Sequence, residues 1–594
     1  MDTAAFPWTR ATFLSERRPR RGGTLSPVGT SERCDAERRL EAWRKRMGAD
    51  AALFAERLAG CGLDGDGLCQ LLVGPGEAGP APDDFSWREL VEDVVAGRYA
   101  DEPLPPFDAL GLGEGRPLPF SSFLAPFLRV GAARLREGMA AMHAGYGAVA
   151  RIRRDVETGL LAELACTLHD RSFRTLLLEL NVARLLGQRS GATPGECLEQ
   201  FSEEAFRDPR GLAEVLGEYP VLARLMASAV DDWAGACLEL LERVTVDREL
   251  LGRALRDGQS PGGLVAVRLG GSEPHWRGRG VALLRFETGL RVVYKPRSLA
   301  VERKLQELVR WLGERGLRFP HRVITVLDRG GYGWMEHVSP SVCPDEEALR
   351  RFYWRQGSLL ALLRLLSATD FHLGNLIAAG EHPVLVDLEA LFQPRRSPMS
   401  PVDDALEHGR TADPDPRPTL GGKPVGPTDF IEEIVQGFEE TYQLIALHRG
   451  TLASVLQTFA EVEVRFIARG SRRYGALLAE SLHPEFLRDG LERDRVLDHL
   501  WREVAAWPEL RRLVPVEHEA LLRGDVPLFT ARPGHRHVWS RDGRCLKDFL
   551  ERDALGEALE RLSRMDDGDR AAQVAFIRQS LGLPSHLDLD APPP

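Results

Sequence analysis

The period of the hydrophobic pattern changes near residue 264, and this change restricts the folds that the chain can adopt. From about 35 to 73 and from 120 to 260, apolar residues recur every three or four positions, which is typical of amphipathic helices. From 264 to 338 the pattern alternates instead and is rich in Val, Leu and aromatic residues, which is typical of strands. We therefore predict a predominantly helical α+β protein.

Turn and cap signals divide the chain further. In the strand-rich part, "ETG" between "VALLRF" and "LRVVYK" predicts a β-hairpin, and "SLAVERKLQELVRWLGERG" predicts an amphipathic helix that stops at glycine. A helix is predicted over 346–367, a mobile Pro-rich segment over 395–428, and helical patterning again from about 428 to 583. A chain of 594 residues is too long for one core, so about three or four structural units are expected. The predicted regions are a flexible tail (1–34), a helical platform (35–260), a first lobe with the hairpin and helix (261–345), a second lobe with helical additions (346–583) and a C-terminal tail (584–594).

Composition and charge argue against several classes of function. The net charge of -11 disfavours nucleic acid as a partner, because no excess of Lys and Arg is available to neutralise phosphates. The Arg-rich "RRPRR" at 17–21 is interpreted as part of a solvated tail. Eight scattered cysteines without a C-x-x-C pair indicate free thiols in a reducing cytosol and offer no zinc site. The N-terminus lacks signal-peptide features, and the most apolar stretch, "SLLALLRLLSA", is too short to span a bilayer, so we expect a cytoplasmic protein.

The stretch "TDFHLGNLIAAGEHPVLVDLEALF" carries the clearest chemistry. Phosphoryl transfer needs a cation on the phosphates, oxygen ligands for magnesium and a base for the hydroxyl proton. Lys295, at the end of a hairpin strand, would grip phosphate, while Asp370 would be the base and His372 would orient the hydroxyl. Asn375 and Asp387 would hold metal, because "LIAAGEHPVLV" predicts two short strands around a turn that folds one residue back toward the other. The alternative is a surface loop followed by a buried strand, with His372 an ordinary core residue.

Two glycines before the hairpin have two interpretations. In "GRGVALLRFETG", Gly278 and Gly280 would let backbone amides approach phosphates, or they would form a plain turn before the strand. The sequence leaves both open.

Several segments together resemble one protein family. The segments "RVVYKPRSL", "GGYGWMEHV", "GSLLALLRLLSATDFHLGNLIAAGEHPVLVDLEALF" and "DVPLFTARPGHRHVW" resemble the dehydratase domain of class II lanthipeptide synthetases, the LanM family. The helical beginning matches as well, in "ERRLEAWRKRM", "APFLRVGAARL" and "YPVLARLMASAVDDWAGACLELLERVTVDRELL". The likeness covers nearly the whole chain. It implies a lipid-kinase-like bilobal catalytic core, with ATP and Mg2+ as cofactors and a leader-bearing ribosomal precursor peptide as partner.

The resemblance also implies a two-step reaction. ATP phosphorylates a Ser or Thr side chain, and the same enzyme then eliminates phosphate to leave dehydroalanine or dehydrobutyrine. The roles that it assigns are phosphate-gripping lysine for Lys295, catalytic loop for Asp370, His372 and Asn375, and metal-binding element for Asp387 and Glu389.

The elimination residues implied by the resemblance show two departures. Glu273 and His275 stand where the family has an Asp-x-His pair, and their plain interpretation is a polar loop. Arg465 and Ser471 stand where the family has an Arg followed six residues later by a Thr. Arg465 would bind the leaving phosphate, and its plain interpretation is an arginine on a helix surface. Both departures concern residues of the elimination step and none of the phosphorylation step.

One family feature is missing from the sequence. Full synthetases of this family continue into a zinc-dependent cyclase, and this sequence shows no Cys/His zinc constellation. We expect a stand-alone dehydratase without zinc that works beside a separate cyclase or other peptide-modifying enzymes, although a truncated chain would give the same pattern. Two alternatives stay open, namely a peptide kinase that has lost elimination and an inert scaffold that binds the leader peptide.

Overall fold

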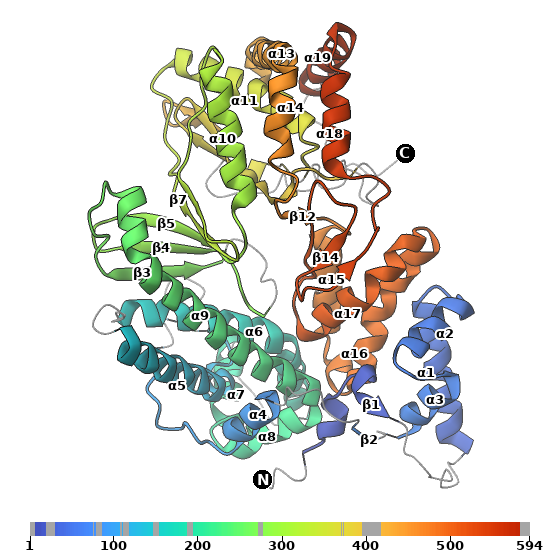
Figure 1. The fold of residues 1–594 in the computed structure, drawn as a ribbon. Helices are drawn as coiled ribbons and strands as arrows, with labels where there is room; N and C mark the ends of the chain where they lie inside the picture. Colours follow the sequence, from blue (N-terminus) through green and yellow to red (C-terminus); the bar gives the residue numbers. More distant parts are fainter. Residues whose placement is uncertain are drawn as a thin grey trace. The chain divides into compact units, whose positions relative to one another are not determined.

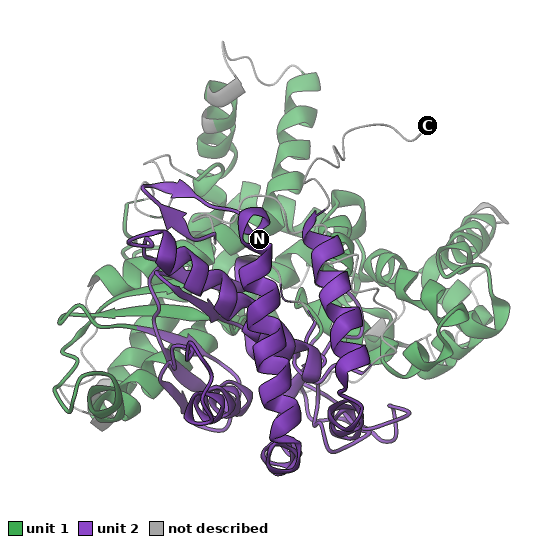
Figure 2. Ribbon diagram, turned by 90° about the horizontal axis from the view of Figure 1, so that it is seen from above, with its two compact units in different colours: residues 1–291, 471–527 green, residues 292–470, 528–594 purple. Residues whose placement is uncertain are grey.

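The computed structural model shows a chain that divides into two compact units, which Figure 2 colours separately. Unit 1 comprises residues 1–291 and 471–527, and unit 2 comprises residues 292–470 and 528–594. Both contain helices and small sheets, so the predicted helix-rich α+β class is confirmed. The boundaries of the predicted regions stay a prediction. The structure describes residues 6–18, 30–74, 77–78, 86–106, 110, 118–146, 154–186, 194–270, 277–369, 371, 373–394 and 417–582.

Unit 1 is built mainly from helices that begin at the residues expected from local chemistry. The Asp50 carboxylate accepts the backbone N–H groups of Ala52 and Leu53, which caps the start of α2, and Pro220 occupies the first turn of α9. The α-helices of unit 1 are α1 (Thr30–Arg46), α2 (Ala51–Gly60), α3 (Gly65–Val73), α4 (Ser86–Val95), α5 (Ser121–Tyr146), α6 (Arg154–Leu185), α7 (Pro194–Ala205), α8 (Pro209–Glu218), α9 (Pro220–Leu255), α15 (Ser471–Ser481), α16 (Gly490–Leu497) and α17 (Val514–Arg523).

Short elements complete unit 1. The strand pairs are antiparallel, β1 with β2 and β3 with β4, and β3 also packs against α6. These elements are η2 (Trp8–Ala11), η3 (Leu14–Glu16), β1 (Arg17–Arg18), β2 (Glu77–Ala78), β3 (Leu264–Leu269), β4 (Ala282–Phe286), η8 (Pro484–Leu487), η9 (Asp498–Ala505) and η10 (Pro508–Arg512), where η denotes a 3-10 helix.

The core of unit 1 centres on α9, which packs against α4, α5 and α6 (Figure 1). Trp233 of α9 is buried, and its indole N–H donates to the carbonyl of Leu160 on α6 at 3.0 Å. A buried Trp needs such a partner for its polar edge. The helical periodicity of 120–260 therefore corresponds to helices that bury a shared apolar face.

The N-terminal residues differ from the expected flexible tail. Phe13 and Leu14 are buried, and the Leu14 backbone N–H donates to Asp494 at 2.7 Å. Arg17 is fully buried, although it begins the "RRPRR" run that was interpreted as solvated, and it pairs with Asp489 at 2.6 Å. A buried guanidinium needs such a carboxylate, and a partner more than 400 residues away in the chain cannot be read from local sequence.

Unit 2 contains the strands and helices that surround the predicted site. Figure 1 shows α11, α13, α14, α18 and α19 gathered into one helical group, and contacts link α13 with both α11 and α19. The α-helices are α10 (Ala300–Glu314), α11 (Glu346–Leu365), α13 (Ile431–Leu447), α14 (Arg449–Gln457), α18 (Ala554–Ser563) and α19 (Asp567–Gly582). The strands are β5 (Arg291–Lys295, which the unit boundary crosses), β6 (Val326–Asp328), β7 (Gly333–Glu336), β8 (Leu376–Ala379), β9 (His382–Leu385), β10 (Thr419–Leu420), β11 (Lys423–Pro424), β12 (Val464–Phe466), β13 (Phe529–Ala531), β14 (Val538–Ser540) and β15 (Cys545–Leu546). The 3-10 helices are η5 (Leu373–Asn375), η6 (Leu388–Ala390) and η7 (Pro427–Phe430).

The predicted hairpin turn and helix are both present. The Phe286 backbone N–H donates to the Leu290 carbonyl at 2.9 Å, and Gly289 adopts a positive φ of 82°, which closes the "ETG" turn. After β5 the chain enters α10, whose apolar face is buried. The turn and the amphipathic helix follow from local sequence, as expected.

A small apolar core joins the β5–β7–β6 strands to the β8–β9 hairpin. Antiparallel pairing places Lys295 opposite Gly333, and Leu376 opposite Leu385 in the hairpin. Gly380, with a φ of 60°, makes the tight turn between β8 and β9, as the sequence predicts. This core fixes the ends of β5 and β9 relative to each other, and its buried members are Leu299, Ile324, Met335, Val338, Ala379 and Val384.

The helix that leads into the predicted catalytic loop is held by an unusually close helix crossing. Gly357 of α11 faces the Ile434 carbonyl of α13, and Gly437 of α13 faces the Trp354 carbonyl of α11. A Cβ at either glycine would overlap the opposing carbonyl oxygen. The close approach therefore requires glycine at both positions.

A four-stranded sheet lies within the stretch that was predicted to be helical from about 428 to 583. The antiparallel order is β12–β13–β14–β15, and Val464 of β12 pairs with Ala531 of β13. Strands of two or three residues give too few alternations to be detected from periodicity, so the prediction of continuous helix was wrong here. Of the segment predicted to be mobile, 395–416 lies outside the described residues, while 419–424 forms the short β10–β11 hairpin.

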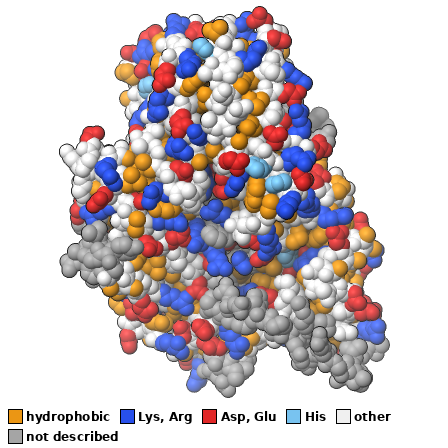
Figure 3. All heavy atoms as spheres, viewed as in Figure 1, with side chains coloured by type: hydrophobic (Ala, Val, Ile, Leu, Met, Phe, Trp, Pro, Cys, Tyr) orange, Lys and Arg blue, Asp and Glu red, His pale blue; other side chains and the backbone are white. Residues whose placement is uncertain are grey.

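The face drawn in Figure 3 carries Lys and Arg side chains interspersed with Asp and Glu. Among the described residues, no helix combines the length and the apolar composition that crossing a bilayer requires.

Candidate active site

Lys295 ends strand β5 and lies in a cluster of carboxylates within unit 2. Its Nζ is 2.8 Å from Asp387 Oδ1 and 3.8 Å from Glu302 Oε1. The Lys295 side chain is only 7% exposed, so its ammonium depends on these carboxylates to offset desolvation. The lysine and the acidic residue that the sequence assigned to one site are therefore in direct contact.

Arg297, two residues after Lys295, connects three carboxylates. Its guanidinium contacts Glu302 Oε1 at 2.6 Å, Asp387 Oδ1 at 3.2 Å and Glu389 Oε2 at 2.8 Å. Glu302 lies in the first turn of α10 and is fully buried. The helix after the lysine strand is thus tied by ion pairs to the segment that follows β9.

The β8–β9 hairpin brings Asp387 back to the segment that contains Asn375. The Val386 backbone N–H donates to the Asn375 carbonyl at 2.9 Å, one residue after the end of the hairpin ladder. Asp387 then adopts a left-handed conformation, with φ and ψ both 62°. This backbone state is uncommon outside glycine, and strained residues of this kind cluster at functional sites. Further along, the Thr369 N–H donates to the Ala390 carbonyl at 3.1 Å.

Glu389 joins the cluster to strand β12. Its Oε1 contacts Arg465 NH1 at 2.8 Å, and its Oε2 contacts Arg297. Gln393 fastens the same strand, because its side-chain amide donates to the Arg465 carbonyl and accepts from the Ile467 N–H. Arg465 was expected, on the plain interpretation, to lie on a helix surface. It lies instead on strand β12, where its side chain is mostly buried and pairs with Glu389, a predicted site residue.

The cluster is close to electrically neutral. Three carboxylates (Glu302, Asp387, Glu389) face three cations (Lys295, Arg297, Arg465). Burial alone would raise the pKa values of Asp387 and Glu389, but the neighbouring cations outweigh it and hold both pKa values below their usual range. The pKa of Arg297 is raised, because its carboxylate partners outweigh the effect of burial. Arg297, Asp387 and Glu389 are therefore charged at neutral pH.

The oxygen donors differ in how well they suit a magnesium ion. Lys295 and Arg297 both contact Oδ1 of Asp387, and this side chain is 41% exposed, so a carboxylate oxygen is accessible to a ligand. An accessible carboxylate oxygen is a ligand type that magnesium prefers. Both oxygens of Glu389, in contrast, contact guanidinium groups, and its side chain is only 14% exposed. Asp387 therefore fits the predicted metal role better than Glu389 does, while the metal role of Asn375 stays a prediction.

Three further predicted residues belong to unit 1. Gly278 has a φ of 70° beside Asp232, a Cβ at Gly280 would meet no atom within 4 Å, and Ser471 is the first residue of α15. The positive φ shows that Gly278 at least forms a turn, which was one of its two interpretations. Four predicted catalytic residues lie outside the described residues, namely Asp370, His372, Glu273 and His275.

Two residues of the cluster were missed by sequence reasoning, and one of them leaves a signal. Glu302 lies on the apolar face of the amphipathic helix, three residues before Leu305 and seven before Val309. An acidic residue inside an apolar stripe requires a buried partner, so it marks a site. Arg297 gives no such signal, because an arginine after a strand is normally solvated.

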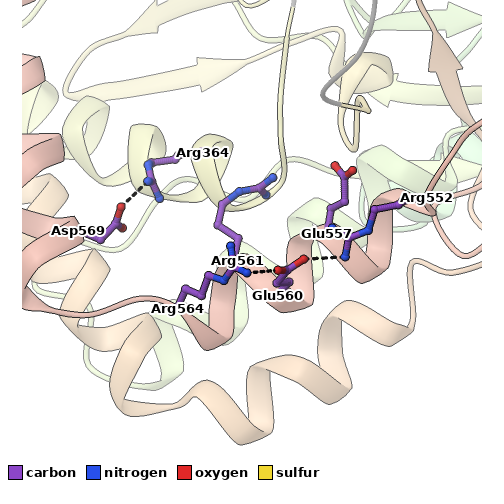
Figure 4. A pocket seen from close by; sticks show the side chains of 7 residues that line it. All are labelled: Arg364, Arg552, Glu557, Glu560, Arg561, Arg564 and Asp569. Carbon is purple, nitrogen blue, oxygen red and sulfur yellow. Dashed lines mark hydrogen bonds and ion pairs between the residues drawn. The ribbon is translucent and has the colours of Figure 1, made fainter.

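A hollow of about 400 Å3 lies elsewhere in unit 2, between the end of α11, one side of α18 and the start of α19 (Figure 4). Its charged side chains largely pair with one another, as in Arg364 with Asp569 at 2.7 Å and Arg552 with Glu560 at 2.6 Å. Arg561 instead reaches the chain before the predicted catalytic loop, where it donates to the Leu365 carbonyl and to Ser367 Oγ. The hollow therefore lies next to a support of the catalytic segment.

Comparisons with known proteins identify the family of the chain. A family model described as "Domain of unknown function (DUF4135)" matches residues 219–413 and 402–532 of the chain, which together exceed half of it. The "Lacticin 481/lactococcin biosynthesis protein LcnDR2" of Lactococcus lactis subsp. lactis is 21% identical over 388 residues, which cover 53% of this chain and 41% of that protein. The matched part thus spans less than half of the relative's length. The chain belongs to the family described as DUF4135, and its predicted relationship to LanM-type lanthipeptide synthetases is confirmed.

Proposed function

We propose that this chain is an ATP- and magnesium-dependent dehydratase that acts on Ser and Thr side chains of a ribosomally made, leader-bearing precursor peptide. Phosphorylation of the hydroxyl would be followed by elimination of phosphate, which leaves dehydroalanine or dehydrobutyrine. The relationship to a lanthipeptide biosynthesis protein supports a peptide substrate. The fold that we propose for the catalytic part is a lipid-kinase-like bilobal core.

One observation carries the proposal, namely the contact between Lys295 and Asp387 with Glu302 beside them. A lysine at the end of a strand, an acid on the following helix and an acid after a later hairpin are the parts that nucleotide-dependent phosphoryl transfer uses. A surface loop followed by a buried strand would not require a lysine of 7% exposure to meet a strained aspartate. This alternative from the sequence is therefore the weaker one.

The first step assigns each residue one task. Lys295 binds phosphate oxygens, Asn375 and Asp387 hold magnesium, and the bound nucleotide with its metal supplies the phosphoryl group. Asp370 takes the proton of the substrate hydroxyl as the new O–P bond forms and the bond to the departing ADP breaks. His372 orients the hydroxyl. These roles use general base catalysis and electrostatic stabilisation of the transferring group.

The second step needs a base and an anion-binding group. Glu273 and His275 are the proposed pair that removes the α-proton, after which the Cα–Cβ double bond forms and the Cβ–O bond breaks. Arg465 binds the leaving phosphate, since its planar fork matches two phosphate oxygens. Ser471 would contribute a hydroxyl donor.

Intact-mass measurement tests the proposal. The chain is incubated with ATP, MgCl2 and the leader-bearing peptide encoded nearest to it, beside the variants Asp387→Asn and Glu307→Gln. Asp387→Asn removes a proposed metal ligand, whereas Glu307 is an exposed acid of α10 that serves as the matched control. We expect wild type and Glu307→Gln to remove one water per modified site and Asp387→Asn to leave the peptide unchanged.

Two other results identify the alternatives. A gain of phosphate that persists would show a peptide kinase without elimination. An unchanged peptide with wild type and Asp387→Asn alike, despite binding of the leader, would show a scaffold and overturn the proposal.

A further inference from the structure

Arg297 contacts its neighbours through all three guanidinium nitrogens. NH1 donates to the Ser298 carbonyl at 3.0 Å and to Glu302 Oε2 at 3.2 Å, and NH2 donates to Glu302 Oε1 at 2.6 Å and to Asp387 at 3.2 Å. Nε forms an ion pair with Glu389 at 2.8 Å. The four N–H groups of NH1 and NH2 are therefore used within the cluster.

Its three carboxylate partners belong to two parts of unit 2. Glu302 lies in the first turn of α10, and Asp387 and Glu389 follow β9. Glu389 also forms an ion pair at 2.8 Å with Arg465 of strand β12. One planar side chain thus sets the spacing among three carboxylates and, through one of them, the position of a second arginine.

We infer that Arg297 is a positioning residue that aligns Asp387 for phosphoryl transfer and, through Glu389, aligns Arg465 for release of phosphate. The inference rests on the proposed function. It explains why both oxygens of Glu389 contact arginines, since this carboxylate would serve as the link between the residues of the two steps.

The two steps depend on Arg297 to different degrees. Asp387 has a second cation, Lys295, at 2.8 Å, which keeps it in place when Arg297 is altered. Without the Arg297 guanidinium, Glu389 would keep only one of its two described arginine partners, Arg465. Glu389 and Arg465 would therefore shift together. A change at Arg297 should therefore impair elimination more than phosphorylation.

Lysine cannot replace Arg297, because an ammonium is a point charge with three donors and cannot span three carboxylates. Arg297→Lys keeps the positive charge but removes the planar guanidinium that contacts all three carboxylates. The matched control is Arg303→Lys on α10, where the arginine is exposed and makes a single helix-surface pair with Glu307. Melting temperatures of all proteins report whether each variant is folded.

Two assays separate the steps. Phosphorylation is followed by intact mass with the unmodified precursor peptide, and elimination is followed with the same peptide carrying a synthetic phosphoserine. We expect Arg297→Lys to slow phosphorylation by about tenfold or less and elimination by about 100-fold, since small displacements of catalytic groups cost that much. Phosphopeptide then accumulates, while Arg303→Lys behaves as wild type.

Two results would overturn the inference. Elimination by Arg297→Lys at the wild-type rate would show that charge alone suffices. An equal decrease in the rates of phosphorylation and elimination would show that the arginine supports only the fold. If Arg297→Lys does not fold, Glu302→Gln serves as a second variant, because it weakens the hydrogen bonds that Arg297 donates to Glu302. This variant must also slow elimination more than phosphorylation, so that phosphopeptide accumulates. Wild-type protein that yields neither phosphopeptide nor dehydrated peptide would instead refute the proposed function.

Discussion

Removing the charge of Lys295 should destabilise the protein mainly through the carboxylate that it leaves behind. In Lys295→Met, Asp387 loses the cation at 2.8 Å and retains Arg297 at 3.2 Å. Asp387→Asn removes the charge from the other side, and asparagine tolerates the left-handed backbone at this position. The double variant removes both charges, so the three variants and wild type form a double-mutant cycle that measures the interaction.

The geometry sets the expected magnitude. Two unit charges at this separation attract by about 6 kcal/mol at an effective dielectric constant of about 20 and by about 1.5 kcal/mol in water. The lysine side chain is 7% exposed and the aspartate side chain 41%, so the environment lies between these limits. After side-chain ordering and desolvation are subtracted, we expect a coupling free energy of about 1–3 kcal/mol.

Urea denaturation followed by fluorescence and by circular dichroism gives the four unfolding free energies, provided that both probes report the same transition. The control cycle uses Arg303 and Glu307, a pair of α10 whose charged groups are 3.2 Å apart and whose side chains are 46% and 41% exposed. We expect that pair to contribute about 0.5 kcal/mol or less. Additive effects of Lys295→Met and Asp387→Asn, within about 0.5 kcal/mol, would refute the claim that these charges stabilise each other.

Three further predictions concern the supports of the site and a separate buried acid. Gly437→Ala should destabilise by about 2–3 kcal/mol, because overlap with the Trp354 carbonyl exceeds the gain of about 1 kcal/mol from helix propensity, and urea denaturation measures this. Arg561→Ala should cost about 1–3 kcal/mol and speed hydrogen exchange around Ser367, whose positive φ of 48° loses a supporting hydrogen bond. Burial first, and Asp525 second, raise the pKa of Asp232 from 3.8 to about 6, so ionising it costs stability as the pH rises through 6. Asp232→Asn should therefore raise the unfolding free energy at about pH 8 by up to about 3 kcal/mol and change it little near pH 4, as urea denaturation at both values would show.

Each of these predictions has a control. Gly450 of α14 has open space around its Cβ position, so Gly450→Ala should be neutral or mildly stabilising, and an equal loss in both glycine variants would contradict the close-crossing argument. Arg564→Ala changes an exposed arginine of the same hollow and should leave exchange around Ser367 unchanged. An Asp232→Asn effect that does not vary with pH would show that the carboxyl ionises normally.

The sequence predicted the elements whose information is local. The change of period near residue 264, the "ETG" turn and the β8–β9 hairpin around Gly380 appear where the residues indicated them, because propensity and short-range pairing act over a few positions. The sheet of β12 to β15 could not be predicted in this way, since each strand is short and Val464 pairs with a residue 67 positions later, Ala531. Pairing between residues so far apart does not produce a hydrophobic pattern in either segment from which the sheet could be predicted.

The same distinction applies to the candidate site. The sequence predicted which residues would carry the proposed chemistry and gave their order, from Lys295 through Asn375 to Asp387. Only the tertiary structure decided that Arg297 and Glu302 belong with them and that both oxygens of Glu389 contact arginines. An ion pair in a partly buried site depends on distance in space and on the loss of water around it, and neither quantity is encoded by neighbours along the chain.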